Sequence, residues 1–377
     1  MLDLRRLRLL RELARRGTIA AVAQALSYSP SAVSQQLAAL EKEAGVRLLE
    51  PAGRRVRLTP QADLLVAHTQ VLLEDMERAE AALARSLNQT AGTLRVAAFQ
   101  TAVLTLVPHA LSQLERQHPS LRVEVTELDP ELALPALTAG QFDLVLGEEY
   151  PGFPLPRPRE TERHDLLTDE LRLIIPTGWN ERSLASLASR PFVMEPVGTT
   201  AREWATAACR QAGFEPDARY TTTDLQIHLR LVESSLAAAL LPDLSGAGDR
   251  DDVTAHRLAG HPRRQIFSTV RSGAARHPKI QAFTTALDMD GQNGVVASEL
   301  AHVALSEGEL DLATRALRAI TMLRTAAPIS KGIAYERLGE IAMHQGDNKK
   351  AAMLLKRAID EDHTLEHARE LLAQLGG

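Results

Sequence analysis

The stretch YSPSAVSQQLAALEKEAGVRLLE, residues 28–50, decides the fold of the amino-terminal part of the chain. Pro30 suits the first turn of a helix, where its missing N–H is not needed, and Gly45 suits the end of that helix. Between them, apolar side chains recur at helical spacing at Val33, Leu37 and Leu40. The stretch therefore predicts a helix with one buried face.

Two more helical patterns lie upstream of this stretch. Gly17 separates them, and the hydroxyl of Thr18 is placed to cap the second one. Residues 27–29 make the turn into the helix that starts at Pro30. Two helices joined by a short turn predict a helix-turn-helix. Beyond it, residues 46–50 and 56–58 alternate apolar and polar side chains, which predicts a two-stranded hairpin with a basic tip.

Short hydroxyl and amide side chains occupy the first turns of the helix that starts at Pro30, where they suit contacts to base edges in a major groove. The arginines of the hairpin are expected to contact phosphate, which positions a protein without reading sequence. An ordinary exposed polar face and simple helix capping are the alternatives. The candidate DNA-contacting residues are Thr18, Ser29, Ser31, Ser34, Gln35, Gln36, Arg54, Arg55 and Arg57.

Charge is distributed unevenly along the 377 residues. Residues 1–58 hold 11 Lys and Arg against 5 Asp and Glu, whereas the rest of the chain holds 32 against 43. A cationic module on an acidic body favours a polyanion at the amino-terminal end. Aromatic residues make up only 3%, too few for a surface of stacked single-stranded bases, so double-stranded DNA is the expected partner.

Length and composition exclude several classes of protein. The chain is long enough for two or three domains, and its single cysteine, Cys209, excludes an intramolecular disulfide and a multi-cysteine metal site. No apolar run is long enough to span a membrane, and arginines interrupt the first leucine-rich stretch where a signal peptide needs an apolar core. We therefore expect a cytoplasmic protein without a membrane segment.

Residues 60–88 contain no glycine and, after Pro60, no proline. Apolar or small side chains alternate at spacings of three and four, which predicts a long helix with a heptad seam. A helix that joins two subunits is one interpretation, and a helix lying on its own domain is the other. The seam comprises Ala62, Leu65, Thr69, Leu72, Met76, Ala79 and Leu83.

From residue 93 the pattern changes to strands alternating with helices, which predicts a parallel sheet. A proline-rich loop over residues 151–158 separates this sheet from a second α/β subdomain, and residues 264–271 are expected to return to the first. Such two-lobed proteins hold a small molecule in a cleft. The candidate effector contacts are Thr101, Glu148, Glu149, Thr199 and Thr200, with an amino-acid-like ligand as the hypothesis and with helix capping and loop solvation as the alternatives.

Residues 291–377 are predicted to be helical throughout, with an internal repeat of 38 residues. Small side chains recur where paired helices approach closely, so each unit is expected to be a helical hairpin, followed by a terminal helix. The string His363-x-x-Glu366-His367 spells a zinc-peptidase signature, but its place in a terminal repeat helix makes a coincidence the preferred interpretation. We expect no metal site and no cofactor.

Residues 1–90 resemble the DNA-binding end of LysR-type transcriptional regulators, through YSPSAVSQQLAALEKEAGVRLLE and GRRVRLTPQA. Residues 93–287 are similar, in the order of their elements, to the two-lobed, periplasmic-binding-protein-like effector domain of that family. The resemblance implies a regulator that binds DNA as a homodimer or homotetramer under control of a small-molecule effector. Residues 291–377 resemble tetratricopeptide repeats, which that family generally lacks.

The expected organisation is thus multidomain, with an all-α winged helix-turn-helix, a two-lobed α/β effector domain and all-α helical-hairpin repeats. An enzyme that uses the cleft is a rival hypothesis that no catalytic constellation supports. A protein-interaction adaptor tethered to DNA through its repeats is a second rival, because the repeats suit a protein partner. The expected boundaries are 1–59 for the winged domain, 60–90 for the linker helix, 91–288 for the effector domain and 289–377 for the repeats.

Overall fold

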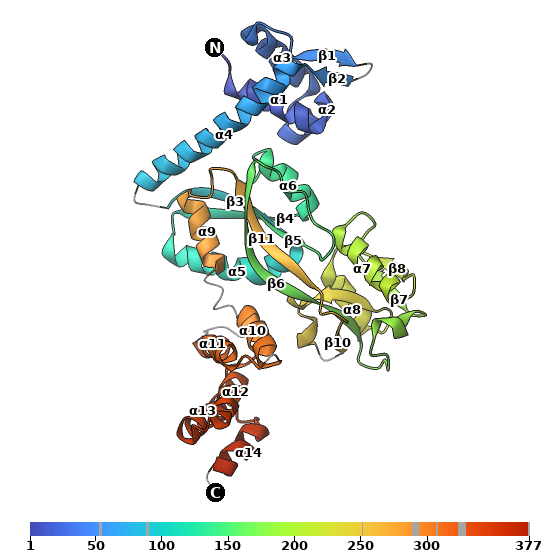
Figure 1. Ribbon diagram of the computed structural model, residues 1–377, viewed down its shortest axis with the longest axis vertical. Helices are drawn as coiled ribbons and strands as arrows, with labels where there is room; N and C mark the ends of the chain where they lie inside the picture. Colours follow the sequence, from blue (N-terminus) through green and yellow to red (C-terminus); the bar gives the residue numbers. More distant parts are fainter. Residues whose placement is uncertain are drawn as a thin grey trace. The chain divides into compact units, whose positions relative to one another are not determined.

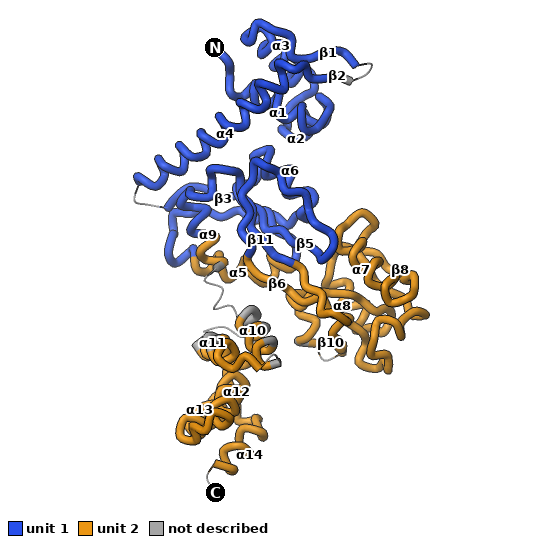
Figure 2. Tube along the Cα trace, viewed as in Figure 1, with its two compact units in different colours: residues 1–100, 114–165, 265–283 blue, residues 101–113, 166–264, 284–377 orange. Residues whose placement is uncertain are grey.

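The computed structural model describes residues 1–52, 55–87, 90–250, 252–288, 294–306, 308–322 and 329–375. The chain divides into two compact units, coloured separately in Figure 2. Unit 1 holds residues 1–100, 114–165 and 265–283, and unit 2 holds residues 101–113, 166–264 and 284–377. Each unit therefore combines segments that lie far apart in the sequence.

The amino-terminal part of unit 1 forms the predicted helix-turn-helix, followed by a hairpin (Figure 1). Gly17 and Gly45 end the first and third helices with φ of 73° and 69°, a left-handed conformation that glycine adopts without strain. One apolar core, which includes Leu10, Val22 and Leu37, holds the three helices together. The elements are α1 (Leu4–Arg16), α2 (Ile19–Leu26), α3 (Pro30–Ala44), β1 (Leu49–Ala52) and β2 (Arg55–Leu58).

The hairpin is shorter at its start than the sequence predicts, because β1 begins at Leu49 and not at residue 46. The Oε1 atom of Glu41 on α3 accepts hydrogen bonds from the backbone N–H groups of Leu48 and Leu49, at 2.8 and 3.1 Å. Because this carboxylate of α3 binds the backbone at Leu48 and Leu49, the residues before Leu49 are held by α3 and lie outside β1. The prediction of a strand from residue 46 was wrong for this reason.

The long helix α4 (Pro60–Ser86) follows β2 directly and spans 27 residues. Its seam has two different environments within one chain. Ala62 and Thr69 are buried, whereas Leu72, Met76 and Leu83, which follow them along the helix, are 47%, 46% and 67% exposed. The seam thus packs on its own domain up to Thr69 and presents apolar side chains to solvent from Leu72 onward.

The remainder of unit 1 is built on a sheet in the order β11, β5, β3, β4. β3 pairs in parallel with both β4 and β5, as predicted, because helical crossovers connect these strands. β11 pairs antiparallel with β5, which confirms that residues 264–271 return to the first subdomain. The strands and the helices that connect them are β3 (Gly92–Ala98), α5 (Gln100–Gln117), β4 (Leu121–Glu127), α6 (Pro130–Thr138), β5 (Leu144–Glu149), β11 (Arg263–Arg271) and α9 (Pro278–Asp288). Residues 101–113 of α5, 263–264 of β11 and 284–288 of α9 belong to unit 2.

The α/β part of unit 2 contains two sets of strands. The long strand β6 pairs antiparallel with β9 and β10, and β7 pairs in parallel with β8. The elements are β6 (Thr161–Pro176), β7 (Pro191–Met194), α7 (Thr200–Gln211), β8 (Asp217–Thr221), α8 (Leu225–Glu233), β9 (Ala239–Pro242) and β10 (Val253–Arg257), with short 3₁₀ turns at Leu184–Leu187, Asp243–Ser245 and Ala247–Asp249.

The carboxy-terminal part of unit 2 is helical. Gly339 lies against the next helix so closely that a Cβ atom there would come within 2.8 Å of Cγ of Leu355, which explains why small residues recur in this region. Across the described part of the chain, no helix has both the length and the apolar composition needed to cross a membrane. The helices are α10 (Gly294–Ser306), α11 (Leu310–Met322), α12 (Lys331–His344), α13 (Asn348–Glu361) and α14 (Glu366–Leu375).

Candidate nucleic-acid interface and internal polar networks

Helix α3 has one buried face and one polar face. Val33 and Leu37 are buried in the core of the amino-terminal domain, whereas Ser34 and Gln35 between them are exposed. Ser31, one turn earlier, is exposed as well. Three of the predicted base-contacting side chains therefore lie on the solvent side of a helix that the core holds in place.

Two of the predicted DNA-contacting hydroxyls cap helices. Thr18 Oγ1 accepts a hydrogen bond from the N–H of Ala21, and Ser29 Oγ accepts one from the N–H of Ala32, each at 3.2 Å. Both caps stabilise helix starts in the helix-turn-helix, which fixes the orientation of α3.

The other predicted contacts have different environments. Gln36 Oε1 accepts a hydrogen bond of 2.9 Å from Nε of Arg6 on α1. The side chain of Arg57 on β2 is 76% exposed and lies 2.9 Å from Glu50 on β1, and Arg55 starts β2 opposite Ala52. Arg54 lies outside the described residues.

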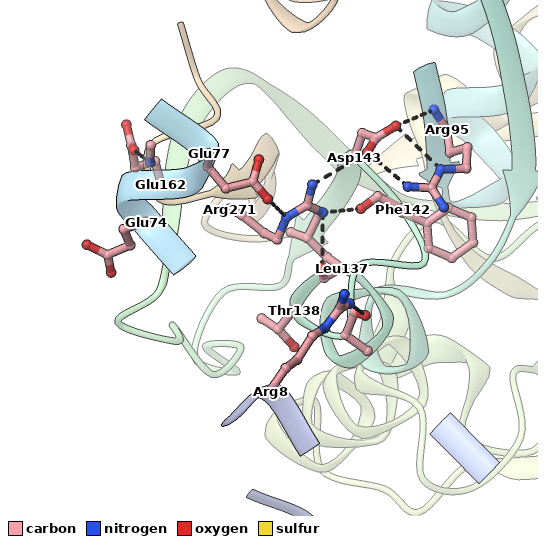
Figure 3. A network of polar contacts seen from close by, with 12 residues as sticks. Arg8, Glu74, Glu77, Arg95, Leu137, Thr138, Phe142, Asp143, Glu162 and Arg271 are labelled. Atoms are coloured by element: carbon pink, nitrogen blue, oxygen red, sulfur yellow. Dashed lines mark hydrogen bonds and ion pairs between the residues drawn. The ribbon is translucent and has the colours of Figure 1, made fainter. Parts of the chain in front are cut away.

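Arginines of α1 contact the carboxy-terminal end of α6. Arg11 Nη2 donates to the carbonyl of Thr138 at 2.9 Å. Arg8, which lies beside Thr138 in Figure 3, donates to the carbonyl of Ala139. The last carbonyls of a helix carry its partial negative charge, so cations bind there favourably. Burial, together with the neighbouring charge of Arg11, lowers the pKa of Arg8. These contacts join the helix-turn-helix to the α/β part of unit 1.

Arg271, the last residue of β11, is the centre of a second set of contacts (Figure 3). Its Nε pairs with Glu77 of α4, its Nη1 donates to the carbonyls of Phe142 and Leu137, and its Nη2 lies 3.4 Å from Asp143. Burial alone would lower the pKa of Arg271, but the hydrogen bond and charge of Glu77, with Asp143, outweigh it and raise the pKa. The linker helix is thus ion-paired to the sheet.

Asp143, just before β5, forms ion pairs with three cations, Arg271, Arg95 and Lys279. Nη2 of Arg95 and Nζ of Lys279 lie 3.1 and 3.3 Å from its carboxylate, and the backbone N–H of Arg95 donates to it at 3.0 Å. Burial would raise the pKa of Asp143, but the bonds from Arg95 and the charge of Lys279 together hold it below its ordinary value. A cavity of about 380 Å³ beside this network is lined by side chains of both signs, including Arg8 and Glu77.

In unit 2, the predicted effector contact Thr101 belongs to a buried ion-pair network. Arg264 Nη2 donates to Thr101 Oγ1 at 2.8 Å and to Asp169 Oδ2 at 2.6 Å. The side chains of Arg264 and Asp169 are only 1% and 2% exposed. Burial raises the pKa of Asp169, whereas the charge of Arg264 opposes that rise. The hydroxyl of Thr101 therefore has a structural partner within the protein.

The other predicted effector contacts fall into two places. Thr199 caps α7: its Oγ1 accepts from the N–H of Arg202 at 3.2 Å, and Thr200 is the first residue of the helix. Glu148 and Glu149 are the last residues of β5 in unit 1, and Glu149 is paired with Arg163 and, at 3.3 Å, with Arg157. Thr199 and Thr200 thus lie together at the start of α7, whereas the carboxylate of Glu149 is already ion-paired with two arginines.

Arg264, Asp169, Arg271 and Glu77 were not among the residues that the sequence singled out. The bonded partners are 95 and 194 positions apart in the chain, so no local spacing signals them. The local indication of a buried ion pair is a charged residue at the end of an apolar strand. Arg264 and Arg271 lie near the two ends of β11 in this way.

Comparison with known proteins supports this architecture. The family described as "Bacterial regulatory helix-turn-helix protein, lysR family" matches residues 4–63, and the "LysR substrate binding domain" matches residues 87–290. LrrA of Synechococcus elongatus, named a probable HTH-type transcriptional regulator, is 29% identical over 296 residues, which cover 76% of this chain and 96% of LrrA. A probable hydrogen peroxide-inducible genes activator of Mycobacterium avium is 29% identical over 267 residues, covering 67% and 83%.

A solved structure has the same fold. Full-length OxyR from Pseudomonas aeruginosa, in a variant form, aligns with a TM-score of 0.53 and 22% identity, covering 76% of this chain and 95% of its own. The matched segments contain the exposed face of α3 and the α/β sheets described above. The chain therefore belongs to the LysR family of transcriptional regulators, which bind DNA through the helix-turn-helix and respond to a small-molecule effector through the substrate-binding domain.

Proposed function

We propose that this regulator binds its operator as a cytoplasmic homodimer whose two α3 helices enter successive major grooves, and that two dimers form a tetramer. The observation that carries the dimer is the uncovered apolar seam of α4, where Leu72, Met76 and Leu83 are about half exposed or more. A second copy of α4 covers such a seam in a parallel or antiparallel pair of helices. Dimeric helix-turn-helix proteins read operators with dyad symmetry.

Ser31, Ser34 and Gln35 are proposed to read bases, and Arg55 and Arg57, with Arg54, to bind phosphate. The support is the exposed polar face of α3, on a helix whose opposite face is buried in the core. Selection of bound duplexes from a random pool tests this function. A consensus of two inverted half-sites is the expected result, and a pool without any consensus would contradict sequence-specific binding.

The effector is proposed to be a small carboxylate, with an amino-acid-like molecule as the first candidate. Thr199 and Thr200 at the start of α7 are the preferred contacts, because backbone N–H groups at a helix start favour an anion. Thr101, Glu148 and Glu149 are weaker candidates, since Thr101 and Glu149 already bind arginines. Thermal-shift screening of carboxylated amines tests the class, and failure of all of them removes it.

Sensing of a peroxide by cysteine oxidation does not fit this chain. Redox-sensing cysteines are accessible and have low pKa values, because the thiolate is the species that reacts. Cys209, the single cysteine, is buried in α7, and burial raises its pKa to about 12. We therefore propose that this protein responds to a signal other than peroxide, although it is similar to a hydrogen peroxide-inducible genes activator.

The helices after residue 290 are proposed to form tetratricopeptide-like hairpins that bind a protein partner. The paired helices and their close packing at Gly339 support this proposal, and the rival role is stabilisation of the oligomer. Deletion of residues 291–377 distinguishes the two. Loss of transcriptional output in cells with unchanged operator affinity and oligomeric state favours a partner, whereas a truncated protein that regulates normally contradicts it.

A further inference from the structure

We propose that Glu336, Glu340 and His367 bind one divalent transition-metal ion that links α12 to the terminal helix α14. One potential ligand atom from each of these side chains lies within 4.8 Å of the other two. The zinc-peptidase-like string at residues 363–367 contributes only its second histidine to this group. His363 and Glu366 of that string are not among the proposed ligands, and two glutamates of α12 take their place.

The packing of two helices brings the three side chains together. Glu336 and Glu340 are four residues apart on α12 and therefore share one face of that helix. Tyr335, next to Glu336, packs against the same apolar cluster as Ala368, which is next to His367 on α14. Contacts on both helices thus place the carboxylates opposite the imidazole.

Glu336 provides a separate indication that a cation belongs here. The residue is only 6% exposed, and its Oε2 atom is buried without a hydrogen-bond partner among the described residues. A buried polar atom without a partner is costly, and a buried carboxylate is more so. A metal ion bound to this oxygen would supply the missing interaction.

The distances suit a small metal ion with N and O ligands. His367 Nε2 lies 3.1 Å from Glu340 Oε1. Ligand atoms of a tetrahedral zinc site, at metal distances near 2.1 Å, are about 3.4 Å apart. An imidazole ligand favours zinc and related transition metals over Mg²⁺ or Ca²⁺. Three protein ligands leave one position for water.

Two further charged groups surround the proposed ligands. Nδ1 of His367 lies 3.7 Å from Glu370 Oε2, on the side where a carboxylate commonly orients a metal-binding histidine. Nη1 of Arg337 donates to both oxygens of Glu340, at 3.1 and 2.9 Å. Arg337 therefore orients Glu340 and is also the cation with which the metal competes.

Calorimetric titration of the full-length, untagged, EDTA-treated chain with ZnCl₂ tests the site. One equivalent of zinc should bind, and His367→Ala and Glu336→Gln should each weaken binding at least about tenfold. His363→Ala is the matched control, because it removes a histidine of the same string that is not a proposed ligand, and it should bind zinc like the wild type. Circular dichroism of each variant establishes that it is folded.

Thermal unfolding provides a readout that does not depend on heat of binding. Zinc should raise the unfolding temperature of the carboxy-terminal helices in the wild type and in His363→Ala, but not in His367→Ala. Absence of saturable zinc binding by the wild type would overturn the proposal. Equal binding by wild type and His367→Ala, or equal loss in His363→Ala, would overturn it too.

Discussion

Arg271, at the end of β11, forms an ion pair with Glu77, in the second half of α4. The same guanidinium lies 3.4 Å from Asp143, just before β5. One side chain of the substrate-binding domain therefore holds the helix that leads to the DNA-binding domain. A shift of β11 relative to β5 would change this contact directly, and we propose that an effector signal reaches the DNA-binding domain through it.

Arg271→Ala should reduce stability and uncouple DNA binding from the effector. Loss of hydrogen bonds to a largely buried charged group costs about 1.5–3 kcal/mol. Operator affinity measured with and without effector should then differ less than in the wild type. Arg78→Ala, which removes an exposed partner of Asp75 on the same helix, should leave both quantities nearly unchanged. Identical effector responses in Arg271→Ala and wild type would exclude this route.

Leu72→Lys should convert the proposed dimer to a monomer, because it places a charge in the apolar seam of α4. Ala67→Lys adds the same charge at an exposed position on the opposite side of the helix and should leave the dimer intact. Sedimentation velocity separates the two species. A wild-type sedimentation profile for Leu72→Lys would show that the seam does not join subunits.

Ser34→Ala combined with Gln35→Ala should lose discrimination between operator and random DNA by about 1–3 kcal/mol for each well-formed base contact removed. Arg57→Ala should instead weaken binding to all DNA and reduce the salt dependence by about one phosphate contact. Fluorescence anisotropy at several salt concentrations measures both effects. Equal losses on operator and random DNA in the α3 variant would argue against base reading.

Asp169→Asn should destabilise unit 2 strongly, because it removes the carboxylate that lies 2.6 Å from the buried guanidinium of Arg264. Removal of one partner from a buried ion pair costs about 3–5 kcal/mol. Arg210→Ala, which breaks an ion pair that is exposed on both sides, should have little effect. Denaturant unfolding followed by Trp fluorescence compares them, and equal midpoints would refute the role assigned to the buried pair.

Stability should fall as the pH drops below about 6.5, in part through His228. Burial lowers the pKa of His228 below its ordinary value of 6.5, so the unfolded chain takes up a proton first as the pH falls. His228→Gln should therefore lose less stability between pH 7.5 and 5.5 than the wild type. His256, His277 and His302 also have lowered pKa values, so some dependence should remain.

The sequence predicted elements well where local chemistry determines them. Helix α3 could be placed closely because Pro30, its apolar face and Gly45 act within one segment. Other elements have little local signal. Residues 161–169 of β6 are mostly polar and show no apolar alternation, so the sequence does not indicate where this strand begins. In β10, His256 and Arg257 give little strand character.

Candidate site residues could likewise be predicted where the local sequence determines them, but not where tertiary packing does. The exposed face of α3 could be predicted, because the sequence places Ser34 and Gln35 between buried apolar residues. The partners of Arg264 and Arg271 could not, since tertiary packing alone brings Asp169 and Glu77 to them. Glu336 and Glu340 carried a weak signal in their spacing of four, but only the position of α14 gives it meaning.

The burial of Cys209 has a practical consequence for measuring motion in this protein. Its thiol is inaccessible and, with a pKa of about 12, almost entirely protonated at neutral pH, so maleimide or nitroxide reagents should not modify it in the folded chain. The natural sequence is then already a background for site-directed labelling. A cysteine introduced at Ala67 or on α14 would carry the single probe, without prior removal of any native residue.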